Sequence, residues 1–274
     1  MKTNFVLITA ENQSSFNNVL PMEYVGDGDR ISIGCYDSQG YVLGAVSFVL
    51  LNDQIDVDWL FVDPQVRRQG VATKLMDRVI AFSSDTMEFY PMSAKYCMYE
   101  DNMPIHEFFV TYSKMDVTYS HERFLVKARD IALSPALHKR IKNKLTPKLF
   151  FNEPPAMQKK ILALMEKNGK FQVEDFESWK KLCVKQLCRC DYIGNMLMDL
   201  IFIQRKPDGN FELSFLYSRY PEGLMSMISN VARDIELQYG GVDLSFDAVS
   251  IESENLARKI FPNAETKQVF EAIW

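Results

Sequence analysis

One order of predicted elements occurs twice along this chain of 274 residues, and the repeat limits the fold more than any other feature. In the first half, the alternation of polar and apolar residues predicts a strand over 5–10, a hairpin over 30–51 and a strand over 54–62. A helix over 71–85 follows, with apolar residues at helical spacing at Val71, Leu75, Val79 and Phe82. The half ends with a strand over 88–98, a helix over 102–115 and a strand over 116–131.

The second half repeats this order after two helices, which we expect over 156–169 and 173–188. Its elements are a hairpin over 197–217, a helix over 223–240, a strand over 242–250, a helix over 253–261 and a strand over 267–274. Duplication of one fold explains the repeat most simply. The sequence therefore predicts a mixed α/β (α+β) protein with two similar domains, residues 1–133 and 151–274, joined by a basic linker over 134–150.

Composition narrows the class of protein. With 47% hydrophobic residues the chain can bury a core in each domain. The net charge of -5 argues against nucleic acid as a partner and favours a cationic small molecule. The first ten residues lack an export signal, and no apolar run approaches the ~18 residues that a membrane span needs. We therefore expect a cytoplasmic protein that is not embedded in a membrane.

Five cysteines are present, and three of them lie close together, at Cys183, Cys188 and Cys190. No histidine is near them, so a shell of four zinc ligands cannot be completed locally. We expect reduced, packed thiols and no metal. A zinc or redox site is the weaker alternative.

The stretch VDPQVRRQGVATKLM, residues 62–76, predicts the end of a strand, a basic turn and the start of a helix. The first helical turn leaves N–H groups without partners and carries partial positive charge, so it can bind an anion. Gly70 permits a positive φ and close approach of the backbone to a bound group. Arg67 and Arg68 can add charge-assisted hydrogen bonds to phosphate. A solvated arginine pair beside a helix is the alternative.

The same stretch resembles motif A of the GNAT superfamily of acyl-CoA-dependent N-acyltransferases, in which Arg67, Gly70 and Ala72 fill the characteristic positions. The resemblance extends over about residues 5–130. It implies two GNAT-like domains, each a mixed, mostly antiparallel sheet flanked by helices. It also implies that the turn cradles the pyrophosphate of coenzyme A with Arg67, Arg68, Gln69, Gly70, Val71, Ala72 and Thr73. The pantetheine arm would pair with the strand backbone at Leu60, Phe61 and Val62.

Two carboxylates on the same strand are candidates for the chemistry. Asp56 and Asp58 lie two residues apart, so both can face one side of a cleft. The resemblance places Asp56 where many family members carry a glutamate base, and the shorter aspartate favours proton transfer through water. Asp58 would bind the cationic group of the substrate. A solvent-exposed strand face is the alternative for both.

Two alignments to the family give different candidates for the general acid. YSKMDV, at 112–117, resembles the family's tyrosine-bearing helix end and makes Tyr112 the acid. Asn102 resembles an asparagine of the cofactor site, and counting from it puts Phe109 in the acid position instead. We prefer Tyr112; packing of an amphipathic side chain is the alternative role.

The second domain keeps the order of elements but not the anion site. Gly223 aligns with Gly70, but Tyr220 replaces Arg67, Pro221 lacks an N–H, and Met225 stands in place of Ala72. We therefore interpret the second half as a degenerate GNAT domain that shapes the substrate cleft or an oligomer interface. A second active site is the weaker alternative.

The resulting hypothesis is an N-acetyltransferase that moves an acetyl group from acetyl-CoA to a primary amine of a small molecule or protein. A non-catalytic acyl-CoA-binding regulatory protein is the main alternative, and a structural tandem domain without a ligand is another. The acceptor is left open, and so is the oligomeric state, a homodimer included.

Overall fold

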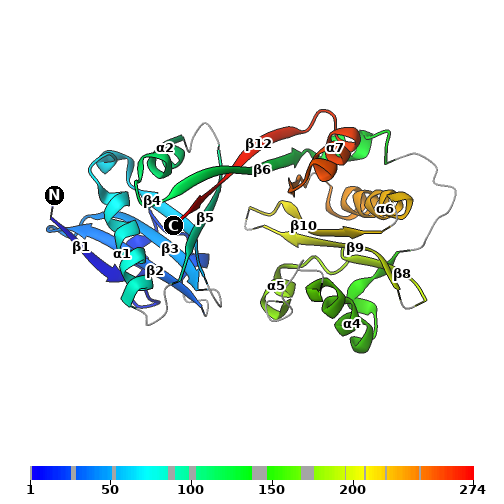
Figure 1. Ribbon diagram of the computed structural model, residues 1–274, viewed down its shortest axis with the longest axis horizontal. Coiled ribbons are helices and arrows are strands. Elements are labelled where there is room, and N and C mark those ends of the chain that lie inside the picture. The colour runs from blue at the N-terminus through cyan, green and yellow to red at the C-terminus, as the bar shows by residue number, and fades with distance from the viewer. Residues whose placement is uncertain are drawn as a thin grey trace. The chain divides into compact units, whose positions relative to one another are not determined.

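The computed structural model describes residues 2–25, 29–50, 54–85, 90–98, 103–137, 147–167, 176–194, 196–206, 208–219, 221–240 and 242–274. The chain divides into two compact units, Met1–Ser120 with Gln268–Trp274, and His121–Lys267 (Figure 1). In the part of the chain that is described, no helix is both long and apolar enough to cross a membrane.

The first unit is a mixed sheet with helices on both faces. Its elements are β1 (Thr3–Leu7), η1 (Gln13–Phe16), η2 (Met22–Tyr24), β2 (Arg30–Asp37), β3 (Val42–Leu50), β4 (Ile55–Val62), η3 (Pro64–Val66), α1 (Val71–Asp85), β5 (Met92–Cys97), α2 (Met103–Thr111) and the end of β12 (Glu265–Ile273). Strands β1 to β4 pair antiparallel in sequence order. Strand β5 pairs parallel with β4 and antiparallel with β12.

The second unit has the same plan. Strand β6 (Asp116–Val126) leads into it, followed by α3 (Ala128–Leu133), β7 (Lys148–Leu149), η5 (Phe150–Asn152), α4 (Pro155–Lys167), α5 (Phe176–Leu182), β8 (Arg189–Ile193), β9 (Met196–Arg205), β10 (Phe211–Ser218), α6 (Pro221–Tyr239), β11 (Leu244–Ala248) and α7 (Ile251–Ile260). Strands β7 to β10 pair antiparallel, β11 is parallel to β10, and β6 is antiparallel to β11. The predicted fold class and the repeated order are therefore confirmed.

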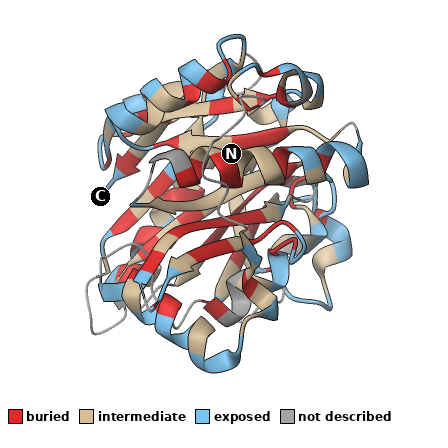
Figure 2. Ribbon diagram, turned by 90° about the vertical axis from the view of Figure 1, so that its right-hand side faces the viewer, coloured by how far each residue is buried: buried red, intermediate tan, exposed pale blue. Residues whose placement is uncertain are grey.

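The predicted helix over 71–85 is present as α1, and its apolar stripe is buried. Val71, Leu75 and Val79 lie in the core of the first unit, and Phe82 packs against that core. A smaller cluster around Phe16 covers the other face of the sheet. In Figure 2 the buried residues follow the strands and inner helix faces, whereas the exposed ones follow the outer faces. Burial of this apolar stripe is what fixes α1 on the sheet.

The last strand of each unit differs from the expectation. Residues 269–273 of β12 pair with β5 of the first unit, and residues 122–126 of β6 pair with β11 of the second. The predicted domains, 1–133 and 151–274, place these two segments in a different unit from the strands with which they pair. Strand pairing at this distance along the chain leaves no local signal, because either strand has the apolar alternation that fits either sheet.

Three local predictions are also wrong. The predicted helix over 173–188 ends at Leu182, and Arg189–Ile193 forms a strand, β8. The strand predicted to run to residue 131 ends at Val126, where α3 soon begins. The predicted linker over 134–150 contains at its end the short strand β7, which pairs with β8. Sheet pairing overrides the local helical pattern at β8, whereas residues 128–133 form a helix in place of the predicted strand.

Because β12 pairs with β5, a substitution near the C-terminus should destabilise the first unit. Ala272 is fully buried in the core of the first unit. We expect Ala272→Glu to lower the free energy of unfolding by at least about 2 kcal/mol, since it buries a carboxylate without a partner. Hydrogen exchange should show lost protection in β5, which pairs with β12, before any loss in β8 and β9.

The control is Gln268→Glu, which adds the same charge at an exposed position on the same strand. Loss of protection first in the strands of the second unit would contradict the pairing of β12 with the first unit.

Candidate functional site

A cavity of about 490 Å³ lies in the first unit, between the end of β4, the start of α1 and helix α2. This volume is within the range of small-molecule sites. The residues that line it are Leu60, Phe61, Val62, Arg67, Arg68, Gly70, Val71, Ala72, Thr73, Pro104, Ile105, Phe108 and Thr111. The cavity therefore brings together most of the residues that the sequence predicted for a cofactor. Gln69 is exposed and is not among them, and Asn102 lies outside the described residues.

The cavity exists because β4 and β5 diverge. Their parallel ladder contains only two pairs, Ile55 with Met92 and Asp56 with Ser93. Beyond Asp56, residues 60–62 of β4 line the cavity in place of pairing with β5. Backbone polar groups along such an edge need partners from a ligand or from water. An extended ligand with amide groups can supply them.

A β-bulge sets the direction of the side chains at this edge. On β3, Ser47 and Phe48 are neighbours, but their partners on β4 are Trp59 and Val57, so Asp58 is the extra residue. Before the bulge, Val57 packs in the core beneath α1. After it, Leu60 packs against that core and Trp59 packs on the opposite face, where its Nε1 donates to the Val19 carbonyl at 2.8 Å. The bulge was not predicted from the sequence, which reads as an uninterrupted alternation.

The turn before α1 has the backbone of an anion site. Gly70 has φ +78° and Arg68 has φ +63°. The first bond inside the helix runs from the Lys74 N–H to the Gly70 carbonyl at 3.1 Å, so the N–H groups of Val71, Ala72 and Thr73 have no acceptor within α1. A Cβ added at Gly70 would meet nothing within 4 Å. Glycine is therefore needed here for its positive φ and not for lack of space.

The two arginines of the turn have different partners. The Nε of Arg67 donates to the Val62 carbonyl at 3.1 Å, and its guanidinium lies 5.8 Å from the centre of the Phe61 ring. Arg67 therefore ties the turn to the end of β4. Arg68 forms an ion pair with Glu107 of α2 at the cavity, and the Arg68 side chain is 71% exposed. A bound anion would compete with Glu107 for Arg68.

Asp56 is the last residue of the β4–β5 ladder, where the two strands begin to diverge, and it is not among the residues that line the cavity. The Ser93 Oγ donates to its Oδ1 at 3.1 Å. Burial raises the pKa of Asp56 above its ordinary value, and the Ser93 hydrogen bond and Lys95 oppose this rise only in part. A carboxylate with a raised pKa is a better proton acceptor near neutral pH than an exposed one.

Asp58 has an internal cation as its partner. Arg30 of β2 forms an ion pair with it and stacks on the Tyr24 ring at 4.7 Å. Burial raises the pKa of Asp58, while the charge of Arg30 lowers it. A substrate ammonium group at Asp58 would first have to displace Arg30, so the structure does not favour the predicted substrate-binding role.

Tyr112 lies in the core of the first unit and not among the residues that line the cavity. Its hydroxyl donates to Asp77 Oδ1 of α1 at 2.8 Å, and Lys114 reaches the same oxygen at 2.8 Å. Burial, followed by the hydrogen bond to Asp77, raises the pKa of Tyr112. The side chain therefore retains its proton and points toward α1, which does not favour the predicted role as general acid.

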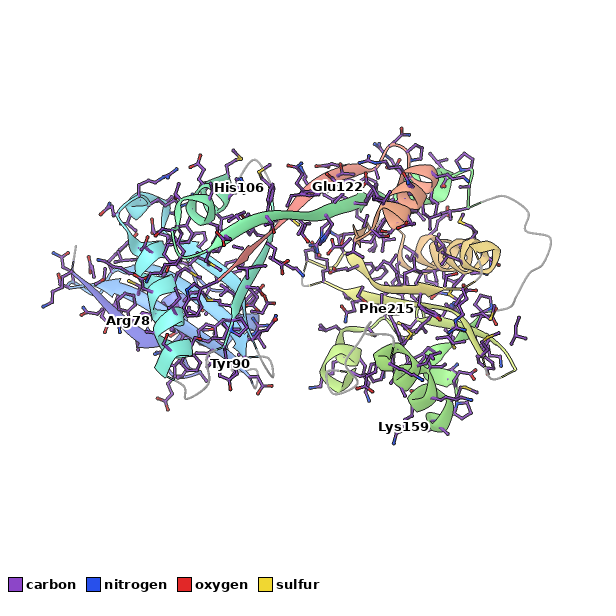
Figure 3. The ribbon with its side chains drawn as sticks, in the orientation of Figure 1. Arg78, Tyr90, His106, Glu122, Lys159 and Phe215 are labelled. Atoms are coloured by element: carbon purple, nitrogen blue, oxygen red, sulfur yellow. The ribbon has the colours of Figure 1, made fainter. Side chains whose placement is uncertain are left out.

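Helix α2, which ends at Thr111, does not place a replacement acid in the cavity. Phe109 is buried and stacks on Tyr96 with ring centres 5.2 Å apart. Thr111 lines the cavity, but its hydroxyl donates to carbonyls of its own helix. His106, labelled in Figure 3, is not among the residues that line the cavity, and its Nδ1 lies 3.1 Å from the hydroxyl of Tyr96 on β5. Among the described residues that line the cavity, none carries a phenol.

Sequence reasoning missed the wall formed by α2. Pro104, Ile105, Phe108 and Thr111 recur at helical spacing and form one face of that helix. The spacing was visible in the sequence, but it equally fits packing against a core. No group of three potential metal ligands occurs among the described residues. None of the five cysteines, all of which are described, forms a disulfide, and burial raises the pKa of Cys190 to about 12.

Residues 9–110 match the family model described as Acetyltransferase (GNAT) family. No curated protein matches the chain. Among solved structures, a tandem GNAT protein from the clavulanic acid biosynthesis pathway is similar, with a TM-score of 0.68 at 11% identity over 99% of this chain and 98% of that one.

Two further structures share the fold. One is a GCN5-related glucosamine N-acetyltransferase region of a fungal multi-domain GH3 beta-N-acetylglucosaminidase, with a TM-score of 0.69 at 12% identity over 100% of this chain and 38% of that one. The other is a GCN5-related N-acetyltransferase from Sphaerobacter thermophilus, with a TM-score of 0.60 at 13% identity over 92% of this chain and 82% of that one. At these identities the likeness concerns the fold.

Tyr112→Phe tests the structural interpretation of that hydroxyl. We expect the free energy of unfolding to fall by about 0.5–1.5 kcal/mol, the range for one lost hydrogen bond, because Asp77 keeps its bond to Lys114. Denaturant unfolding measures the change. A loss of turnover of 100-fold or more with unchanged stability would instead make Tyr112 the acid.

Proposed function

We propose that this protein transfers an acetyl group from acetyl-CoA to a primary amine of a small molecule or protein. The starting point is the match of residues 9–110 to the GNAT acetyltransferase family model. One observation carries the proposal. The unpaired edge of β4 and the N-terminal turn of α1 line a single cavity. An extended amide chain that ends in a diphosphate needs both features side by side.

The fit of acetyl-CoA rests on the donor set of this cavity. The N–H groups of Val71, Ala72 and Thr73 would hold the pyrophosphate, and Arg68 would add a charge-assisted bond. The backbone of residues 60–62 would pair with the pantetheine arm. When bound, the cofactor supplies the acetyl group as a thioester.

Asp56 is the proposed general base. It lies where β4 and β5 diverge, and its raised pKa suits removal of a proton from an ammonium or amine through one water. The short aspartate side chain favours this relay. Tyr112 is left without a catalytic role, because its hydroxyl is bonded to Asp77. A thiol has an ordinary pKa of about 8.5, so a thiolate can leave and take its proton from water.

The direct test measures thiol release from acetyl-CoA with a panel of primary amines, beside calorimetry with acetyl-CoA alone. Binding together with amine-dependent release supports the transferase. Binding without release for any amine supports the acyl-CoA-binding regulatory protein, which the lack of a phenol among the described cavity residues favours as second candidate. Lack of binding rejects both.

Gly70→Val should weaken acetyl-CoA binding by about 10-fold to 100-fold, because a β-branched residue resists the positive φ that aims the helix start at the ligand. Calorimetry gives the dissociation constant. Gly40→Val is the matched control, since Gly40 also has a positive φ and open space but lies in the β2–β3 hairpin. Equal affinity in both variants would remove the turn from the site.

Asp56→Asn should lower kcat by about 100-fold or more and leave acetyl-CoA affinity within about twofold. The substitution should also change how the free energy of unfolding depends on pH. Because the pKa of Asp56 is raised in the folded state, the folded protein binds this proton more tightly than the unfolded chain, and its stability falls as pH rises above about 4.

Asp56→Asn has no carboxyl group here to lose a proton. Its free energy of unfolding relative to the parent should therefore increase between pH 4 and pH 7. Urea unfolding at both pH values measures the difference. Full turnover in Asp56→Asn would exclude the residue as base.

A further inference from the structure

The second unit contains a cavity of its own, of about 420 Å³, where β10 and β11 diverge beneath α6 and α7. The parallel ladder of these strands ends at Leu213 with Phe246. Phe215, labelled in Figure 3, lines the cavity just after a bulge in β10. The volume is that of a small-molecule site.

The position of one carboxylate repeats between the units. In the first, Asp56 pairs with Ser93 across the parallel ladder, two residues before the bulge at Asp58. In the second, Glu212 pairs with Ser245, two residues before the bulge at Ser214. Glu212 is thus the counterpart of Asp56, and it lines the second cavity.

The second cavity is not built for a nucleotide. Its lining from α6 begins at Ile228, two turns into the helix, so the helix start takes no part in it. Most of the lining is aliphatic, including Ile201, Ile203, Val231, Ile235, Leu256 and Ile260. These side chains belong to the core cluster on the helix-covered face of the sheet. They fit a hydrocarbon body.

The charged lining residues lie on the opposite face of the same strands. Glu212 and Asp247 alternate with Phe211, Leu213, Phe246 and Ala248, which face the helices. Asp247 receives two hydrogen bonds from Arg123, at 2.6 and 2.8 Å, and His121 lies 3.2 Å from it. Arg123 reaches Glu212 only at 3.7 Å. Asp247 therefore has the shorter contacts, to Arg123 and His121, and the contact of Glu212 with Arg123 is longer.

We propose that this cavity binds a hydrophobic primary amine, with its hydrocarbon body beneath α6 and α7 and its ammonium group at Glu212, which the ligand reaches where β10 and β11 diverge. The repulsion of two carboxylates disfavours a fatty acid, and a neutral alcohol would add no positive charge beside Glu212, whose contact with Arg123 is long. The site is separate from the acetyl-CoA cavity and does not rest on the proposed function.

Calorimetry of the full chain with octylammonium chloride, at pH 7 and low salt without acetyl-CoA, tests the proposal. We expect one equivalent to bind, 1-octanol to bind at least tenfold more weakly, and octanoate more weakly still. Glu212→Gln should weaken octylammonium binding at least tenfold. Glu236→Gln removes an exposed charge from α6 and should leave the affinity within twofold.

Two variants locate the amine. Ala257→Phe should abolish binding because it fills the cavity from α7, and Asp56→Asn should leave it within twofold. Lack of binding by the parent chain, unchanged affinity in Glu212→Gln, or tighter binding of octanoate would each overturn the proposal. Weakening in Asp56→Asn with none in Glu212→Gln would place the amine in the first unit and overturn it too. No turnover is measured, so failure here leaves the transferase proposal standing.

Discussion

The site depends on the divergence of two parallel strands after a ladder of two pairs. A continuous ladder would use the backbone groups of β4 for pairing with β5 and would close the cavity. The bulge at Asp58 supports the divergence, because an extra residue increases the local twist and turns the following side chains to new faces. Leu60 and Val62 thereby reach the cavity, while Trp59 anchors the strand on the other face.

Both units keep this divergence but surround it with different chemistry. In the first, a helix N-terminus and two arginines meet the cavity, which makes its wall cationic. In the second, α6 begins with Pro221, which has no N–H, and the cavity wall is aliphatic with two carboxylates. The two units also carry opposite charges at equivalent strand positions. Lys95 of β5 pairs with Glu271 of β12 in the first unit. At the equivalent positions in the second unit, Asp247 of β11 pairs with Arg123 of β6. Ligand preference follows from these residues and not from the shared fold.

The sequence predicted the features that depend on local patterns. The apolar period of α1 and the turn at Gly70 are local, and both are present as expected. Features that depend on distant partners were not predictable in this way. The exchange of β6 and β12 is decided by pairing between strands more than 100 residues apart in sequence, for which the alternation of each strand gives no preference.

The role of Tyr112 shows the same limit at a single side chain. Its place in the sequence fits a helix end near a thiolate, but its hydroxyl direction is set by Asp77, 35 residues earlier. Burial of the phenol, together with its hydrogen bond to this carboxylate, makes release of its proton harder and raises its pKa. The direction of this side chain is therefore decided by a partner on α1 that the local sequence does not reveal.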